Sequence, residues 1–159
     1  MKVVSNTSPL CYLVLLELID VLPELFPEIL APASVLAELS HRDSPASVKA
    51  WASKPPSWVL IRSVDVEPPP ELAHLHRGET DVIMLAEAVE ADWVILDEKQ
   101  ARQTASDLGL HVIGLLGILD LAAKKDLIDL PTAFDRLRET TYYVSPRLLE
   151  KLLSKHRNH

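Results

Sequence analysis

The sequence has few of the residues that mark several common classes of protein. Its 159 residues include one cysteine, Cys11, which excludes an internal disulfide and leads us to expect a reducing, cytoplasmic location. The longest apolar stretch near the start, Leu10 to Leu16, is far too short to span a bilayer. Neither a basic region nor a small-residue cleavage site of a signal peptide accompanies it. We therefore expect no membrane association.

Glycine and aromatic residues are also scarce. Four glycines form neither a phosphate-cradling loop nor a Gly/Ser linker, so we expect one domain over residues 1–159. The tryptophans, Trp51, Trp58 and Trp93, lie in three different predicted elements. This spacing favours core or interface anchors over a platform for stacking nucleic-acid bases.

The net charge of −7 argues against a protein that coats nucleic acid without specificity. Residues 1–123 carry 8 basic and 18 acidic residues, whereas residues 124–159 carry 8 basic and 5 acidic ones. We therefore distinguish an acidic α/β body, 1–123, from a basic helical C-terminal segment, 124–159. Two interpretations stay open: an ordinary solvated surface, or a basic flank that guides a polyanion toward an acidic pocket.

Short β-rich runs alternate with helical patterns along the chain. This alternation predicts a three-layer α/β/α sandwich around a central, mostly parallel sheet, with a helical C-terminal extension. The expected strands are 2–5, 28–31, 58–64, 93–96 and 111–113. The expected helices are 10–22, 32–40, 45–53, 78–91, 99–108, 115–125, 131–140 and 146–155, with Gly109 ending the fifth in a C′ position.

Polar residues gather where strands end, which is the edge at which parallel sheets bind ligands. Ser5 to Ser8 follow the first strand, and Asp97 and Glu98 follow the strand 93–96. Convergent carboxylates repel one another unless a cation lies among them, and Mg²⁺ or Mn²⁺ prefers such oxygen ligands. Helices add three further candidates, Glu38, Glu79 and Asp81. Helix capping, helix-dipole stabilisation and a plain surface position are the alternative roles for these acids.

Four short motifs resemble those of one protein family, in the same order, and a fifth run resembles the closing strand and turn of one branch of it. They are Val3-Val4-Ser5-Asn6-Thr7-Ser8-Pro9-Leu10, Leu36-Ala37-Glu38-Leu39, Arg77-Gly78-Glu79-Thr80-Asp81-Val82-Ile83, Val94-Ile95-Leu96-Asp97-Glu98-Lys99-Gln100-Ala101-Arg102, and Gly109 to Gly117. Together they resemble PIN-domain proteins, in a largely uncharacterised prokaryotic branch similar to the toxins of toxin–antitoxin pairs.

The resemblance implies a divalent-metal-dependent endoribonuclease, dimeric in many members and inhibited in many by a small antitoxin. It implies catalytic roles for Glu38, Asp81 and Asp97. The implied Mg²⁺ or Mn²⁺ ligands are drawn from Asn6, Glu38, Glu79, Asp81, Asp97 and Glu98, with Asp97 favoured over Glu98 because it lies nearer the strand end. Thr7 and Ser8 are candidates for contact with a ligand water or phosphate, and Lys99 and Arg102 for phosphate contact.

One position departs from the family pattern. Where the first motif leads with aspartate, this chain has Asn6, which brings no negative charge and cannot act as a base. A catalytically degenerate PIN scaffold that binds RNA or protein is therefore the alternative function. A phosphoacceptor receiver domain fits less well, because the first strand ends in Ser5-Asn6 and no lysine follows Ile113.

The C-terminal segment carries an apolar stripe at helical spacing, Leu148, Leu149, Leu152 and Leu153. We expect this stripe to form a homodimer seam, to receive an antitoxin, or to pack into the molecule's own core.

Overall fold

The computed structural model describes residues 1–143 and 145–157, with only the backbone described at Arg157. Its central sheet has five parallel strands in the order β3-β2-β1-β4-β5. The strands are β1 (Val3–Ser5), β2 (Ile29–Pro32), β3 (Val59–Arg62), β4 (Trp93–Ile95) and β5 (Val112–Ile113). The first strand of the chain therefore lies at the centre of the sheet, paired on one side with β2 and on the other with β4.

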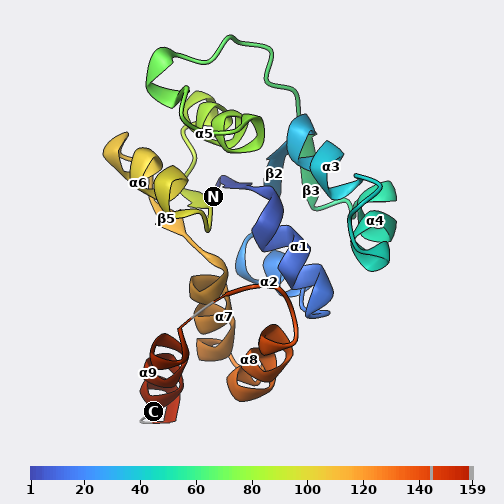
Figure 1. Cartoon of the computed structure of the whole chain (residues 1–159), viewed down its shortest axis with the longest axis vertical. Coiled ribbons are helices and arrows are strands. Elements are labelled where there is room, and N and C mark those ends of the chain that lie inside the picture. Colours follow the sequence, from blue (N-terminus) through green and yellow to red (C-terminus); the bar gives the residue numbers. More distant parts are fainter. Residues whose placement is uncertain (144, 158–159) are drawn as a thin grey trace.

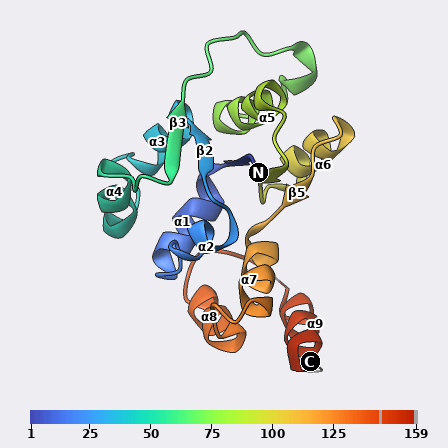
Figure 2. The same cartoon turned by 180° about the vertical axis from the view of Figure 1, so that it is seen from behind.

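Helices cover both faces of this sheet. They are α1 (Thr7–Leu15), α2 (Val21–Leu25), α3 (Ala33–Leu39), α4 (Ala46–Ser53), α5 (Arg77–Val89), α6 (Lys99–Asp107), α7 (Leu115–Lys124), α8 (Leu130–Arg138) and α9 (Pro146–Arg157), with a 3₁₀ turn η1 (Pro70–Leu72). Figures 1 and 2 show α5 and α6 on one side of the sheet, and α1, α2 and α7 on the other. The predicted three-layer fold with a helical C-terminal extension is confirmed.

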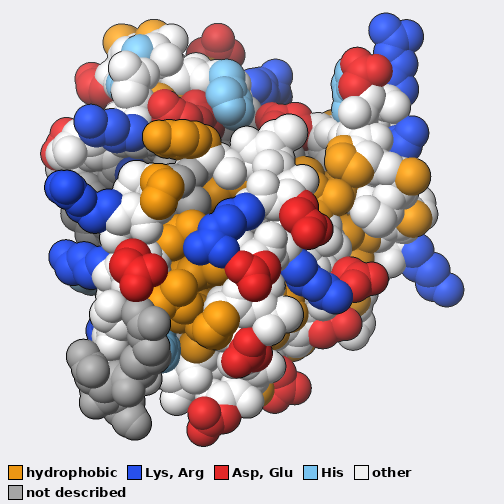
Figure 3. All heavy atoms as spheres, turned by 60° about the horizontal axis from the view of Figure 1, so that its bottom comes forward, with side chains coloured by type: hydrophobic (Ala, Val, Ile, Leu, Met, Phe, Trp, Pro, Cys, Tyr) orange, Lys and Arg blue, Asp and Glu red, His pale blue; other side chains and the backbone are white. Residues whose placement is uncertain are grey.

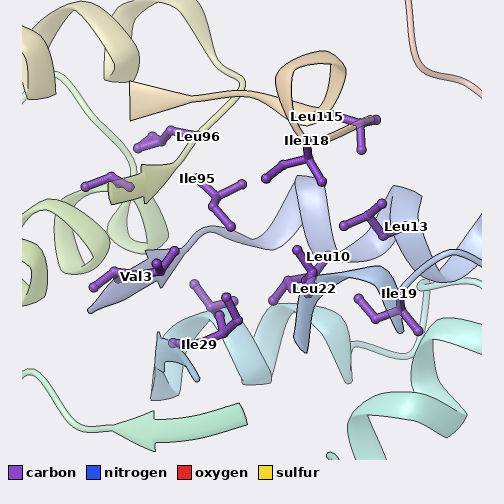
Figure 4. Close-up of a cluster of buried hydrophobic side chains, with 14 of the residues drawn as sticks. Val3, Leu10, Leu13, Ile19, Leu22, Ile29, Ile95, Leu96, Leu115 and Ile118 are labelled. Carbon is purple, nitrogen blue, oxygen red and sulfur yellow. The ribbon is translucent and has the colours of Figure 1, made fainter. Parts of the chain in front are cut away.

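The core fills the space between the sheet and the helices on either side. Figure 4 shows Val3, Ile29 and Ile95 of the strands next to Leu10 of α1 and Ile118 of α7. Each of these side chains is at most 1 % exposed. The inner strands β1, β2 and β4 read as apolar runs without alternation because both of their faces are largely buried. The three tryptophans pack against this core, as predicted.

The prediction of one helix over residues 10–22 is wrong. The helix α1 ends at Leu15, and the chain reverses at Glu17, whose φ of 59° is left-handed. The amide of Leu18 donates to the Leu13 carbonyl at 2.8 Å, and that of Glu17 donates to the Val14 carbonyl at 2.9 Å. This pair of bonds is a Schellman ending with glutamate in the position that glycine usually takes. The apolar pattern continues across the break, so the pattern gave no sign of it.

The C-terminal helices α8 and α9 pack against α7. Asp120 of α7 is the main polar anchor: His156 Nε2 lies 2.6 Å from it, Lys124 Nζ 3.2 Å and Lys155 Nζ 3.5 Å. Burial alone raises the pKa of Asp120, but these partners hold it below its usual value. The predicted stripe faces inward at Leu149, which is 2 % exposed, and stays open at Leu148, which is 41 % exposed. Figure 3 shows that side chains of both charges surround the hydrophobic ones on this lower face.

The left-handed backbone of Asp126 allows a test of what a non-glycine residue costs at the end of a helix. Asp126 ends α7 with a φ of 59°, in the same pattern of hydrogen bonds as Glu17. Asp126→Gly should raise the free energy of unfolding by about 0.5–1 kcal/mol, because relief of left-handed strain exceeds the added freedom of the unfolded chain. Denaturant titration measures this difference. The control Lys151→Gly, inside α9, should lower stability by about 1 kcal/mol. Equal destabilisation by both variants would contradict the strain at Asp126.

Candidate metal and active site

The parallel pairing of β1 and β4 places two candidate residues at the same edge of the sheet. Ser5 lies in register with Ile95, so that Asn6 and Asp97 follow directly beyond neighbouring strand ends. The amide of Asn6 donates to the Ile95 carbonyl at 3.0 Å, which continues the ladder by one bond. Asn6 is 3 % exposed, and its side chain therefore enters a largely dehydrated space.

The carboxylate of Asp97 is bonded on one oxygen only. Oδ1 accepts the amide of Leu115 at 2.9 Å and the hydroxyl of Tyr142 at 3.2 Å. Oδ2 is buried and has no hydrogen-bond partner. Burial raises the pKa of Asp97, although the two donors and the charge of Arg102 oppose that shift. Asp97 thus keeps one buried oxygen free for a further ligand.

The close approach of Arg102 to Asp97 depends on Gly114. A Cβ added at this position would lie 2.7 Å from both Asp97 Oδ1 and Arg102 Nη1. Any side chain at Gly114 would therefore push these two groups away. On the outer side, Asp97, Lys99 and Arg102 line a cavity of about 370 Å³ together with Gln103 and Ser106 of α6.

Two more buried oxygens beside Asp97 lack partners, Asn6 Oδ1 and Thr7 Oγ1. Buried polar atoms are bonded in nearly all proteins, so unpaired oxygens at a strand edge indicate a missing ligand or water. The three oxygens belong to residues at the β1–α1 junction and just beyond β4. Ser8, the next residue in α1, is half-buried.

A second cluster forms at the start of α5, around Glu79. Glu79 is 4 % exposed, and its Oε1 lies 3.4 Å from Nε2 of His76. Burial raises the pKa of Glu79, the His76 ring lowers it, and the charges of Glu98 and Glu38 raise it again. Glu79 therefore shares its surroundings with two further carboxylates, one at the end of α3 and one that caps α6.

Gly78 allows Glu38 to approach this cluster. A Cβ at Gly78 would collide with Glu38 Oε1, so the carboxylate lies directly against the first turn of α5. Glu98 is the N-cap of α6 and accepts the amide of Gln100 at 3.3 Å. The capping role considered for Glu98 is thus realised, whereas Asp97 bonds to α7 instead.

Asp81 is engaged by Ser34 and Arg77. It is two residues beyond Glu79, about 200° around the helix axis. Its Oδ2 accepts the hydroxyl of Ser34 at 2.6 Å and lies 3.4 Å from Nε of Arg77. It lines a different cavity, of about 470 Å³, beside the 64–68 segment. The structure therefore places the charges of Glu38 and Glu98 near Glu79, and the Ser34 hydroxyl and the Arg77 guanidinium beside Asp81.

Sequence reasoning missed two residues of this site, His76 and Tyr142. His74 and His76 form an H-x-H pair, which without a nearby cysteine or third histidine does not mark a metal site in the sequence. His74 in fact contacts Thr104 Oγ1 at 3.0 Å, while His76 pairs with Glu79. Tyr142 lies 45 residues from Asp97, and no local pattern marks it.

Within the described residues, no three His, Cys, Asp or Glu side chains converge tightly enough to hold a metal ion by themselves.

Comparison with known proteins identifies the family. A family model described as a PIN domain matches residues 2–158. The chain belongs to the PIN-domain family. A solved PilT N-terminus domain protein from the hyperthermophilic archaeon Sulfolobus solfataricus has a similar fold, with a TM-score of 0.55 and 18 % identity over 74 % of this chain and 90 % of that one. None of the curated proteins matches the chain. No helix in the described part of this PIN domain is long and apolar enough to cross a membrane.

PIN domains are commonly nucleases and generally use divalent metals. The donor set of this PIN domain fits a hard cation, because the unpaired atoms Asn6 Oδ1, Thr7 Oγ1 and Asp97 Oδ2 are all oxygens. The carboxylates of Glu38, Glu79 and Glu98 lie near one another and repel. A cation bound at this edge relieves that repulsion.

The buried charge of Glu79 gives a test that needs no metal. Because its pKa is raised on folding, the contribution of Glu79 to stability is most favourable below the unfolded value near 4.5 and is lost as the pH rises through the folded value. In metal-free protein, Glu79→Gln should therefore raise the Tm by a few degrees at pH 7, and the gain should shrink toward pH 4.5. Thermal unfolding across this pH range measures it. The exposed control Glu87→Gln, on the same helix, should leave the Tm nearly unchanged. A lower Tm for Glu79→Gln at pH 7 would contradict the conclusion that the buried charge of Glu79 destabilises the metal-free protein.

Proposed function

We propose that this PIN domain is a divalent-metal-dependent endoribonuclease. The observation that carries the proposal is the pair of unpaired, buried oxygens, Asn6 Oδ1 and Asp97 Oδ2, at adjoining strand ends. The raised pKa of Glu79 supports it, since a carboxylate crowded by Glu38 and Glu98 is suited to a cation. In this proposal Glu79 takes the role that the family resemblance gave to Asp81.

The proposed direct cation ligands are Asn6 and Asp97. Glu38, Glu79 and Glu98 form a neighbouring acidic cluster that is proposed to reach the cation through water, because no three of the described carboxylates converge on one point. Asp81 is proposed to have a structural role, because Ser34 and Arg77 already engage its carboxylate. Mg²⁺ or Mn²⁺ suits these oxygen donors, and such an ion lowers the pKa of a bound water and stabilises charge on a phosphate.

The proposed reaction is hydrolysis of an RNA phosphodiester. Water oxygen bonds to phosphorus, the bond from phosphorus to the 3′ oxygen breaks, and the products carry a 5′-phosphate and a 3′-hydroxyl. Arg102 and Lys99 line the outer cavity beside Asp97 and are proposed to hold the phosphate. Thr7 and Ser8 begin α1, whose first backbone amides are suited to the same anion.

A second function is favoured by a specific observation, the amide at Asn6. An amide oxygen can ligate a hard cation but adds no charge, so metal binding is weaker than with aspartate. Under this alternative the molecule is a PIN scaffold that binds RNA or protein without cleaving it.

The nuclease proposal also includes three finer assignments: a role as the toxin of a toxin–antitoxin pair, a small antitoxin partner, and a homodimer. The open stripe residue Leu148 is one element of such a surface.

Cleavage of a mixed single-stranded RNA pool tests the enzyme. With Mg²⁺ or Mn²⁺ and no chelator, the wild-type protein should cut the RNA, and Asp97→Asn should reduce the rate by about 10²-fold or more. Asn6→Asp should lower the metal concentration needed for half-maximal rate by about tenfold, because it adds one ligand charge. The control Glu71→Gln, exposed on η1, should cut like the wild type.

The variants separate the two functions. If only Asn6→Asp cleaves RNA, the natural protein is a degenerate scaffold. If neither cleaves and both remain folded by circular dichroism, the nuclease proposal is wrong. Equal rates in the wild type and Asp97→Asn would instead point to a contaminating nuclease.

A further inference from the structure

The segment between α8 and α9 returns to the candidate site. Figures 1 and 2 show this segment running from α8 back past α7 toward α9. Within it, the hydroxyl of Tyr142 donates to Asp97 Oδ1 at 3.2 Å. The Tyr142 ring stands edge-on to Tyr12 of α1, with centroids 5.0 Å apart, and the Tyr12 hydroxyl lies 2.8 Å from Thr141 Oγ1. Residues outside the α/β body thus contact a carboxylate at its sheet edge.

Tyr142 and the Leu115 amide both bond to Oδ1 of Asp97, and neither bonds to Oδ2. A carboxylate is planar, so two donors that hold one oxygen also fix the direction of the other. The oxygen left over, Oδ2, is the buried one without a partner. The two donors therefore select which oxygen of Asp97 is available to a ligand.

We propose that Tyr142 is a positioning residue for the cation site. Its hydroxyl holds Asp97 Oδ1 and so leaves Oδ2 as the oxygen that binds a divalent cation. This inference rests on the proposed function, since it assigns a role toward the same cation. Groups that orient a metal ligand contribute strongly to metal affinity, and their removal costs about 10- to 100-fold.

The position of Tyr142 is fixed independently of the cation. The ring contact with Tyr12 holds it on one side, and α9 holds the following chain through Leu149, which is buried, and through the bonds of Lys155 and His156 to Asp120. The segment is therefore in place before any ligand arrives, as a pre-formed site requires.

The same segment also forms one wall of a cavity beside Asp97. This cavity, of about 360 Å³, is lined by Asp97, Arg102 and Tyr142 and, from α9, by Leu148 and Leu152. Asp97 and Tyr142 thus both face this cavity, which extends to α9.

Tyr142→Phe is the decisive variant, because it removes the hydroxyl and keeps the ring against Tyr12. Mn²⁺ affinity is measured by titration calorimetry or by the electron paramagnetic resonance of free Mn²⁺. Tyr142→Phe should bind Mn²⁺ about tenfold more weakly than the wild type, at the lower end of the range because the Leu115 bond stays. Its Tm without metal should stay close to that of the wild type. Tyr143→Phe, the neighbouring and largely exposed tyrosine, is the matched control and should bind Mn²⁺ like the wild type.

Cleavage supplies a second readout that a purely structural role would not move. Saturating Mn²⁺ should restore the rate of Tyr142→Phe, whereas it should not restore that of Asp97→Asn. Unchanged Mn²⁺ affinity in Tyr142→Phe would overturn the positioning role and leave the metal site intact. A rate loss that Mn²⁺ cannot rescue would also overturn it. Absence of Mn²⁺ binding in the wild type would overturn the metal site, and this inference with it.

Discussion

The pairing of β1 with β4 is the constraint on which the site depends. Because the two strands are parallel and in register, the residues that follow them, Asn6 and Asp97, must lie at the same edge. Helix ends carry further polar groups: Glu38 at the end of α3 and Glu79 in the first turn of α5 lie near each other, and the Leu115 amide at the start of α7 bonds to Asp97. The sheet fixes the positions of the strand ends, and the helix ends add the polar groups. This arrangement is common in parallel α/β folds.

The carboxylates Glu79 and Asp97 are poorly solvated. Burial raises the pKa of both Glu79 and Asp97, although each has a nearby basic group. Asn6 fits this balance, because an aspartate there would add a third buried charge on the adjoining strand. The amide therefore favours the stability of the metal-free protein at the expense of cation affinity. A site of this kind trades folding free energy against ligand binding, as many functional sites do.

Much of this structure could be predicted from the sequence, where local patterns specify it. Apolar runs separated by helical segments gave the parallel sheet, and Gly109 has the left-handed backbone expected of it, with a φ of 83°. Glu17 was missed because a non-glycine residue at a left-handed position carries no sequence signal. The partners of Glu79 and Asp81 could not be read from the sequence, because both side chains are buried on α5 and only the packing of α3 decides that Ser34 bonds to Asp81. The bond of Tyr142 to Asp97 was beyond reach, since it depends on how the C-terminal segment returns across the body.

The central place of β1 has a consequence for synthesis in the cell. This strand is made first, and its partner Trp93 follows Val3 ninety residues later, so one edge of β1 has no native neighbour while the intervening chain is being translated. An unpaired apolar strand is a template for association with other chains. The nascent protein is therefore most vulnerable to aggregation before β4 emerges, and slower translation of residues 6–92 would prolong that exposure.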